Sequence, residues 1–178
     1  MTKEESELVK KAQKGDNGAF GEIYDRHLPA IYRFILLKVG TRVDAEDICH
    51  QVFLSAWQNI GNYREKGFPF SSWLYKIARN AVVDHWRTNK VNVNIELVSE
   101  NLLSDLPDIG EKIDKKLELK LIWGALRLLD EDHQNLLIMK FVDELSNKEI
   151  AGILGKSEGA VRVIQHRALK QIKKILEQ

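Results

Sequence analysis

The fold of this chain is decided by residues 145–176, which read LSNKEIAGILGKSEGAVRVIQHRALKQIKKIL. A short amphipathic helix is expected at its start. Ser146 can cap that helix, and Glu149 stands three residues later, where it completes a capping-box pattern. Gly155 ends the helix, because glycine readily takes the left-handed conformation of a tight turn. The pattern therefore predicts a helix followed at once by a turn.

A second, longer helix is expected to follow this turn, with Ser157 as its cap. Its apolar residues recur at helical spacing and form a buried face: Val161, Ile164, Ala168, Ile172 and Ile175. The opposite face is mostly cationic and polar, with Arg162, Val163, His166, Arg167 and Lys170. This spacing is typical of a helix-turn-helix, whose second helix can lie in the major groove of DNA. The alternative is a plain helical hairpin within a bundle.

Composition narrows the class of protein. The 178 residues include 44% hydrophobic and 30% charged residues but only three prolines, which favours an all-α protein. The charged start of the chain does not resemble a signal peptide, and no apolar run is long enough to cross a membrane. The single cysteine, Cys49, excludes an internal disulfide and a multi-cysteine metal site. A cytoplasmic protein is expected.

Charge is unevenly distributed although the net charge is only +1. Residues 64–90 contain six Lys or Arg against two acidic residues, and residues 156–178 have the same balance. Residues 91–118 contain seven acidic residues against three Lys. Two basic modules joined by an acidic segment indicate two contacts with a polyanion, although a helical surface can show such blocks by chance.

The first half of the chain predicts a helical domain at residues 1–90. Helices are expected over residues 4–14, from a cap at Asp16 or Asn17 to Val39, and from a cap at Asp44 to Ile60. A loop over 59–72 and a helix from Ser71 or Ser72 to Arg87 are expected to follow. The third helix has more apolar side chains than one face can bury, so Phe53 or Trp57 is expected to stay partly exposed. The loop mixes cations with aromatic residues, a composition that suits single-stranded nucleic acid but equally suits a plug beneath the loop.

Helical periodicity is lost over residues 91–113, which are rich in Asn, Ser and acidic residues. This segment is predicted to be a flexible linker between two domains. Residues 114–178 then form a second helical domain, in which Asp130 caps the helix before the helix-turn-helix. The expected fold is therefore all-α, with two small domains, the second a four-helix, winged-helix-like unit.

Sequence motifs for an enzyme were not found. The chain has no phosphate-binding glycine loop, no HExxH and no nucleophile elbow. Its histidines are isolated from one another, so neither a metal site nor a cofactor is expected. The chain is predicted not to be an enzyme.

Three blocks resemble the extracytoplasmic-function (ECF) branch of bacterial RNA polymerase sigma factors. The first is Asp44–Ile48 with Gln51–Phe53, which resembles the polymerase-binding helix of that family. The second is Phe70–Asn80, with Asp84 and Arg87 beyond it, which resembles the promoter-melting helix. The third is the helix-turn-helix itself. The blocks cover nearly the whole chain in the family's order.

The resemblance implies a transcription initiation factor with two DNA contacts. Binding to the clamp coiled coil of core RNA polymerase is assigned to Asp44, Asp47, Gln51, Phe53 and Trp57. The flap of the core enzyme is also an expected partner. Recognition of the minus-ten element is assigned to Tyr63, Phe68, Lys76, Asn80, Asp84 and Arg87. One base of that element is expected to leave the stack and be read as a single strand. The minus-thirty-five duplex is assigned to Ser157, Arg162, Val163, His166, Arg167 and Lys170. The acidic linker would thread near the active-site channel, and an anti-sigma partner is expected.

The recognition helix departs from the family pattern. Many members have Lys-Ser-Arg after the valine, whereas this chain has Arg162-Val163-Ile164, so its minus-thirty-five preference is expected to differ. Two other functions remain open from sequence. One is a stand-alone regulator with a helical sensor or dimerisation domain, and the other is a helical adaptor that binds only proteins.

Overall fold

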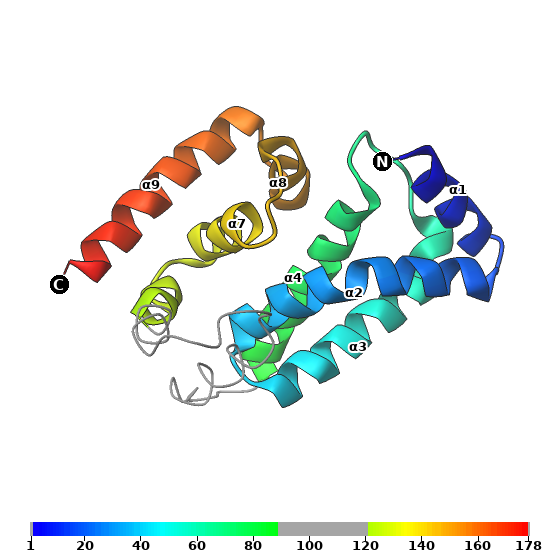
Figure 1. Cartoon of the computed structure of the whole chain (residues 1–178), viewed down its shortest axis with the longest axis horizontal. Helices are drawn as coiled ribbons and strands as arrows, with labels where there is room; N and C mark the ends of the chain where they lie inside the picture. The colour runs from blue at the N-terminus through cyan, green and yellow to red at the C-terminus, as the bar shows by residue number, and fades with distance from the viewer. Residues whose placement is uncertain (1, 89–120, 178) are drawn as a thin grey trace, which may run out of the picture.

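The computed structural model describes residues 2–88 and 121–177, and every regular element in these ranges is helical. The N-terminal lobe (residues 2–88) contains α1 (Lys3–Ala12), α2 (Asn17–Val39), α3 (Arg42–Asn59), the short 3₁₀ helix η1 (Ile60–Asn62) and α4 (Phe70–Thr88). The C-terminal lobe (residues 121–177) begins with helical residues 121–127 and continues with α7 (Glu131–Phe141), α8 (Asn147–Leu154) and α9 (Glu158–Leu176). The predicted all-α fold is confirmed (Figure 1).

Most helix ends follow the caps expected from sequence. Asp16 caps α2, Asp130 caps α7 and Ser157 caps α9, each accepting a hydrogen bond from a backbone N–H three residues on. The cap of α3 was expected at Asp44, but it is Thr41, which accepts from the Asp44 N–H. Because Thr41 stands three residues before Asp44, α3 begins earlier than predicted, and Asp44 lies in its first turn.

The N-terminal lobe is built around α2, which packs against α1, α3 and α4 (Figure 1). The end of α2 is buried on every side, so Phe34, Ile35 and Leu36 all lie in the core. Phe34 meets the fully buried Tyr75 of α4 edge to face, with ring centroids 5.3 Å apart. This packing fixes the orientation of α4 and of the loop before it.

The C-terminal lobe places α9 across α7 and α8. Val161 and Ala168 of α9 are fully buried, as are Leu136 of α7 and Ile150 of α8. Within residues 121–177 there is no strand that could form a wing. The predicted linker, residues 91–113, and the first residues of the predicted second domain lie outside the described residues.

The two lobes are in contact, although far apart in sequence. Helix α8 packs on α4, and α7 lies beside the end of α2. Arg33 of α2 donates from Nε and Nη2 to Oδ1 of Asp143, at 3.0 and 2.9 Å. Nearby, the Lys38 Nζ donates to Oε1 of Gln134 at 2.7 Å, with both side chains buried. The hydrophobic core also continues from one lobe to the other.

Candidate nucleic-acid interface

The turn between α8 and α9 has the geometry that the sequence predicted. Ser146 and Glu149 form a complete capping box at the start of α8. Gly155 takes φ +65°, which ends α8 and turns the chain toward Ser157. The Ser157 Oγ then accepts from the Ala160 N–H at 3.2 Å. A residue with a side chain would be strained at Gly155, so the angle between α8 and α9 depends on this glycine.

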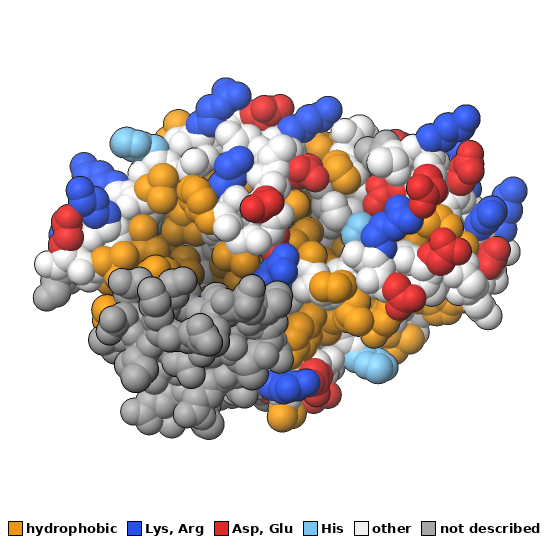
Figure 2. Space-filling model, viewed as in Figure 1, with side chains coloured by type: hydrophobic (Ala, Val, Ile, Leu, Met, Phe, Trp, Pro, Cys, Tyr) orange, Lys and Arg blue, Asp and Glu red, His pale blue; other side chains and the backbone are white. Residues whose placement is uncertain are grey.

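The exposed face of α9 contains all the residues predicted there. Ser157 precedes the helix at its exposed end, while the buried Val161 and Ala168 anchor the opposite face. The exposed side chains are those of Arg162, Val163, His166, Arg167 and Lys170. Figure 2 shows Lys and Arg side chains along the outer edge of this lobe, where α9 lies. A cationic helix face free of the core can approach phosphates and base edges.

The loop before α4 encloses a small pocket with aromatic and cationic walls. Its volume is about 260 Å³, and its lining includes Tyr63, Phe68, Trp73, Arg64, Lys66 and Lys76. Tyr63, Phe70 and Trp73 form a ring cluster with centroids 5.0 to 5.2 Å apart. Ser72 also lines the pocket, and its buried Oγ has no hydrogen-bond partner among the described residues. Such a pocket can hold an unstacked base, with its rim cations near the backbone.

The ring cluster resolves the choice that the sequence left open for the loop aromatics. Phe70 is fully buried and Tyr63 is 8% exposed, so both serve mainly as the plug beneath the loop. Phe68 and Trp73 are half-buried and line the pocket. The same aromatic cluster thus forms both the core under the loop and the wall of the pocket.

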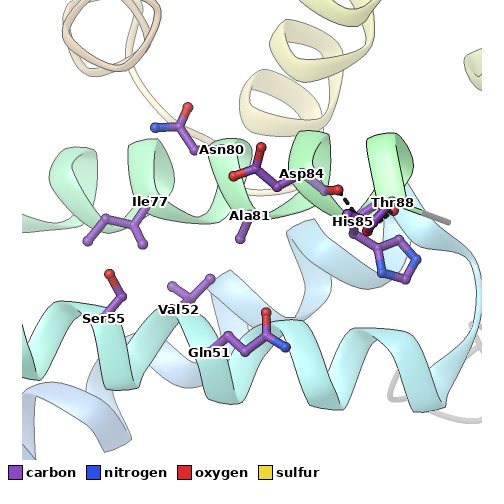
Figure 3. Close-up of a pocket in the computed structure, with 9 residues that line it drawn as sticks. All are labelled: Gln51, Val52, Ser55, Ile77, Asn80, Ala81, Asp84, His85 and Thr88. Atoms are coloured by element: carbon purple, nitrogen blue, oxygen red, sulfur yellow. Dashed lines mark hydrogen bonds between the residues drawn. The ribbon is translucent and has the colours of Figure 1, made fainter.

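The outer face of α4 continues from this pocket. Lys76, Asn80, Asp84 and Arg87 are all exposed there, and the Arg87 Nη1 lies 3.4 Å from the Asp84 Oδ1. Asn80 and Asp84 also border an open groove of about 580 Å³ between α3 and α4. In Figure 3, their side chains point away from α3, while Ile77 and Ala81 face it.

Helix α3 presents an exposed polar face on the other side of this groove. Asp47 and Gln51 are exposed, and the Asp44 Oδ1 lies 3.8 Å from the His85 Nε2. Trp57 is half-buried against Phe20, with ring centroids 4.8 Å apart.

One residue assigned to this face lies in the core. Phe53 is 3% exposed and packs edge to face on Tyr24, so it offers no surface to a partner. Leu54 is 54% exposed and Val43 is 70% exposed, and sequence reasoning missed both as surface residues. Because α3 carries apolar residues on most faces, periodicity could not show which of them face outward. Their position beside Asp47 and Gln51 gives this face an apolar component.

The Cys49 thiol of α3 has no role in the candidate interface. Burial raises the pKa of the Cys49 thiol to about 12, which makes it a poor nucleophile and metal ligand at neutral pH.

In residues 2–88 and 121–177, no three His, Cys, Asp or Glu side chains are grouped as a metal site would require. None of the helices described is both long and apolar enough to cross a membrane.

The fold and these surfaces define a two-lobed helical protein with a helix-turn-helix in its second lobe. Two known protein families match this chain, one in each lobe. Residues 23–91 match the Sigma-70 region 2 family, and residues 125–174 match the Sigma-70 region 4 family.

Curated relatives agree over nearly the whole chain. The ECF RNA polymerase sigma factor SigD of Mycobacterium tuberculosis is 30% identical over 93% of this chain and 81% of its own length. SigW of Bacillus subtilis is 27% identical over 94% of each chain. BldN of Streptomyces coelicolor is 33% identical over 96% of this chain, which spans 65% of BldN. The chain belongs to the ECF sigma factors, a family of transcription initiation factors that are not enzymes.

Solved structures show the same fold. CnrH, solved in complex with the cytosolic domain of CnrY, aligns over 98% of this chain and 97% of its own, with a TM-score of 0.74 and 22% identity. RpoE, solved in complex with the anti-sigma factor NepR from Bartonella quintana, aligns over 89% of this chain and 96% of its own, with a TM-score of 0.65 and 22% identity.

Proposed function

We propose that this chain binds core RNA polymerase and directs it to promoters with specific minus-ten and minus-thirty-five elements. The supporting observation is that the two lobes present different chemistries for DNA. Helix α9 offers an exposed cationic face suited to a duplex groove, whereas the loop before α4 offers an aromatic pocket suited to an unstacked base.

The proposed minus-thirty-five contact is the exposed face of α9, from Ser157 to Lys170. The proposed minus-ten contact is the loop pocket with the exposed face of α4, where Phe68 and Trp73 flank the base and Lys76 lies at the rim. Asn80, Asp84 and Arg87 extend this face along α4. Extruding a base costs a few kcal/mol, which contacts in the pocket must offset.

The proposed polymerase contact is the exposed face of α3. It includes Asp47 and Gln51, and we add Leu54 in place of the buried Phe53. An exposed leucine beside a carboxylate and an amide suits a protein partner better than DNA, since the carboxylate would repel phosphate. Because RpoE was solved in complex with the anti-sigma factor NepR, we also propose that an anti-sigma factor controls this chain.

A gel-shift experiment separates this function from the two alternatives. Promoter fragments selected from a random library are incubated with the chain, with and without bacterial core polymerase. The proposed function predicts weak binding by the chain alone and specific binding with core. Specific binding by the chain alone, as a dimer on a palindrome, indicates a stand-alone regulator instead. Absence of any DNA dependence indicates a protein adaptor.

Arg167→Ala is expected to weaken binding of the holoenzyme to duplex promoter by about 1–3 kcal/mol, concentrated at one base position, if this exposed guanidinium contacts a base edge. The matched control is Lys173→Ala, which removes another exposed cation from the last turn of α9 and is expected to change affinity by less. Affinities are measured by titration on a set of single-base promoter variants. Equal losses for the two variants at every position would exclude Arg167 from base recognition.

Asp47→Ala is expected to weaken binding to core polymerase while the helix content, measured by circular dichroism, stays unchanged. The exposed Asp47 caps no helix, because Thr41 performs that role for α3, so its loss should leave the fold intact. Glu7→Ala removes an exposed carboxylate from α1 and serves as the control. Core affinity is measured by competition against a labelled sigma factor. If Asp47→Ala and Glu7→Ala compete equally well, Asp47 does not belong to the interface.

A further inference from the structure

The loop before α4 is bound to α1 at its first turn. The chain between α3 and α4 runs past α1 in Figure 1, and α1 contacts η1 at the start of this loop. Gln13, the C-terminal cap residue of α1, bridges this contact. Its side-chain Nε2 donates to the Ile60 carbonyl oxygen at 3.0 Å and to the Tyr63 carbonyl oxygen at 2.9 Å. Because a side-chain amide has two N–H groups, one residue satisfies both carbonyls.

These two carbonyls belong to the two ends of one turn. Ile60 begins η1, and the backbone N–H of Tyr63 donates to the Ile60 carbonyl oxygen at 3.0 Å. Gln13 therefore holds the turn as a unit. The Tyr63 carbonyl also accepts from the Arg64 Nη1 at 3.0 Å. Arg64 belongs to the same loop, so its hydrogen bond cannot anchor the loop to the rest of the lobe, whereas the hydrogen bonds from Gln13 can.

The anchored turn carries two of the residues that line the loop pocket, Tyr63 and Arg64. The Tyr63 ring packs on Trp73 of α4, with ring centroids 5.2 Å apart. The Arg64 Nη1 donates to the carbonyl oxygens of Gly61 and Tyr63, at 3.1 and 3.0 Å. The position of this guanidinium beside the pocket therefore depends on the turn that Gln13 holds.

The docking of α1 itself does not depend on Gln13. Leu8, Val9 and Ala12 of α1 are buried, and the helix packs against α2. Burial of these side chains contributes more to stability than one or two neutral hydrogen bonds. Removing the Gln13 amide should therefore release the turn while α1 stays in place.

We propose that Gln13 is a positioning residue for minus-ten recognition, which holds the turn over residues 60–63 so that Tyr63 and Arg64 are in place before a base enters the pocket. The proposal rests on the promoter-binding function proposed above. A loop that is ordered in advance loses less conformational entropy on binding, so its affinity for the base is higher. Gln13 acts through the two carbonyls and does not touch the DNA.

The test measures how much the extruded base contributes to binding. Holoenzyme assembled with core polymerase is titrated with a labelled single-stranded oligonucleotide that carries the minus-ten sequence of a selected promoter. Parallel oligonucleotides carry an abasic site at each position in turn. For wild type, the abasic site at the extruded position should weaken binding about ten- to hundredfold, as loss of a base stacked on aromatic side chains does. This ratio of affinities is the base-dependent factor.

Gln13→Met removes the amide but keeps a side chain of similar length. It is expected to lower the base-dependent factor about three- to tenfold, as the loss of one or two neutral hydrogen bonds would, and to bind the abasic oligonucleotide as wild type does. Gln13→Lys supplies a donor of similar reach and should retain most of the factor, since its added charge acts on both oligonucleotides alike. The control, Gln171→Met, removes an amide that bonds to His133 in the other lobe and should leave the factor unchanged.

A purely structural role would weaken binding of the intact and abasic oligonucleotides alike. That result, or an unchanged factor in Gln13→Met, would overturn the proposal. Circular dichroism at the assay temperature checks that the variant is folded. If it is not, Gln13→Asn, whose shorter amide cannot reach both carbonyls, is measured against the same outcomes. Equal binding of the intact and every abasic oligonucleotide by wild-type holoenzyme would instead contradict the proposed function, so the two failures are distinguishable.

Discussion

Arg33→Ala is expected to separate the two lobes of the free chain at neutral pH. The Asp143 side chain is only 1% exposed, and both of its hydrogen bonds from Arg33 would be lost. Leaving a buried charge unpaired costs about 3–5 kcal/mol. Separation of the lobes lets water reach the carboxylate and relieves this cost. Small-angle X-ray scattering should show a larger radius of gyration than for wild type.

The pH dependence of this variant gives a second check. Burial raises the pKa of Asp143 in the closed form, in which the lobes are in contact, and Arg33 opposes that rise. Without Arg33 the closed form binds a proton more readily than the open form, so lowering the pH below neutral should make the variant compact again. Arg26→Ala breaks an exposed ion pair with Glu4 and should leave the radius unchanged. An Arg33→Ala chain as compact as wild type at pH 8 would contradict this role.

Lys38→Met is expected to remove a large pH dependence from the stability of the chain. Lys38 is 1% exposed, and burial lowers the pKa of its ammonium group to about 8. The folded state therefore binds fewer protons than the unfolded state between about pH 8 and 10.5. Stability rises with pH across this window and is lost again as the pH falls through 8. The total change is about 3 kcal/mol.

The measurement is the difference in free energy of unfolding between wild type and Lys38→Met, obtained with urea from pH 7 to 10.5. Groups that titrate alike in both proteins cancel in this difference. The difference should grow in favour of wild type as the pH rises, because wild type gains stability and the methionine variant does not. A flat difference would show that Lys38 is hydrated in solution and that α7 does not cover it.

Local features of the fold could be predicted from the sequence because each depends on neighbouring residues. The capping box of Ser146 and Glu149 and the left-handed Gly155 specify the helix-turn-helix within ten residues. At the start of α3, Thr41 and Asp44 are both residue types that can cap a helix, and the neighbouring residues do not decide between them. On the same helix Phe53 faces the core and Leu54 faces outward, which only the position of α2 decides.

The contact between the lobes could not be predicted. Arg33 and Asp143 are 110 residues apart, and Arg79 and Glu131 are 52 apart. Periodicity shows that a helix face is buried but not which helix covers it. The sequence therefore indicated the loop, the cations and the helix-turn-helix separately. That Gly152 of α8 lines the loop pocket follows only from the packing of α8 on α4.

In vitro transcription with purified bacterial core polymerase tests the central claim most directly. Core alone and core with the full chain are given a pool of promoter templates, and the 5′ ends of the transcripts are mapped. Two lobes that recognise two promoter elements should yield new transcripts starting at one fixed distance from a shared pair of sequences. Transcripts identical to those of core alone, in number and start position, would contradict the claim.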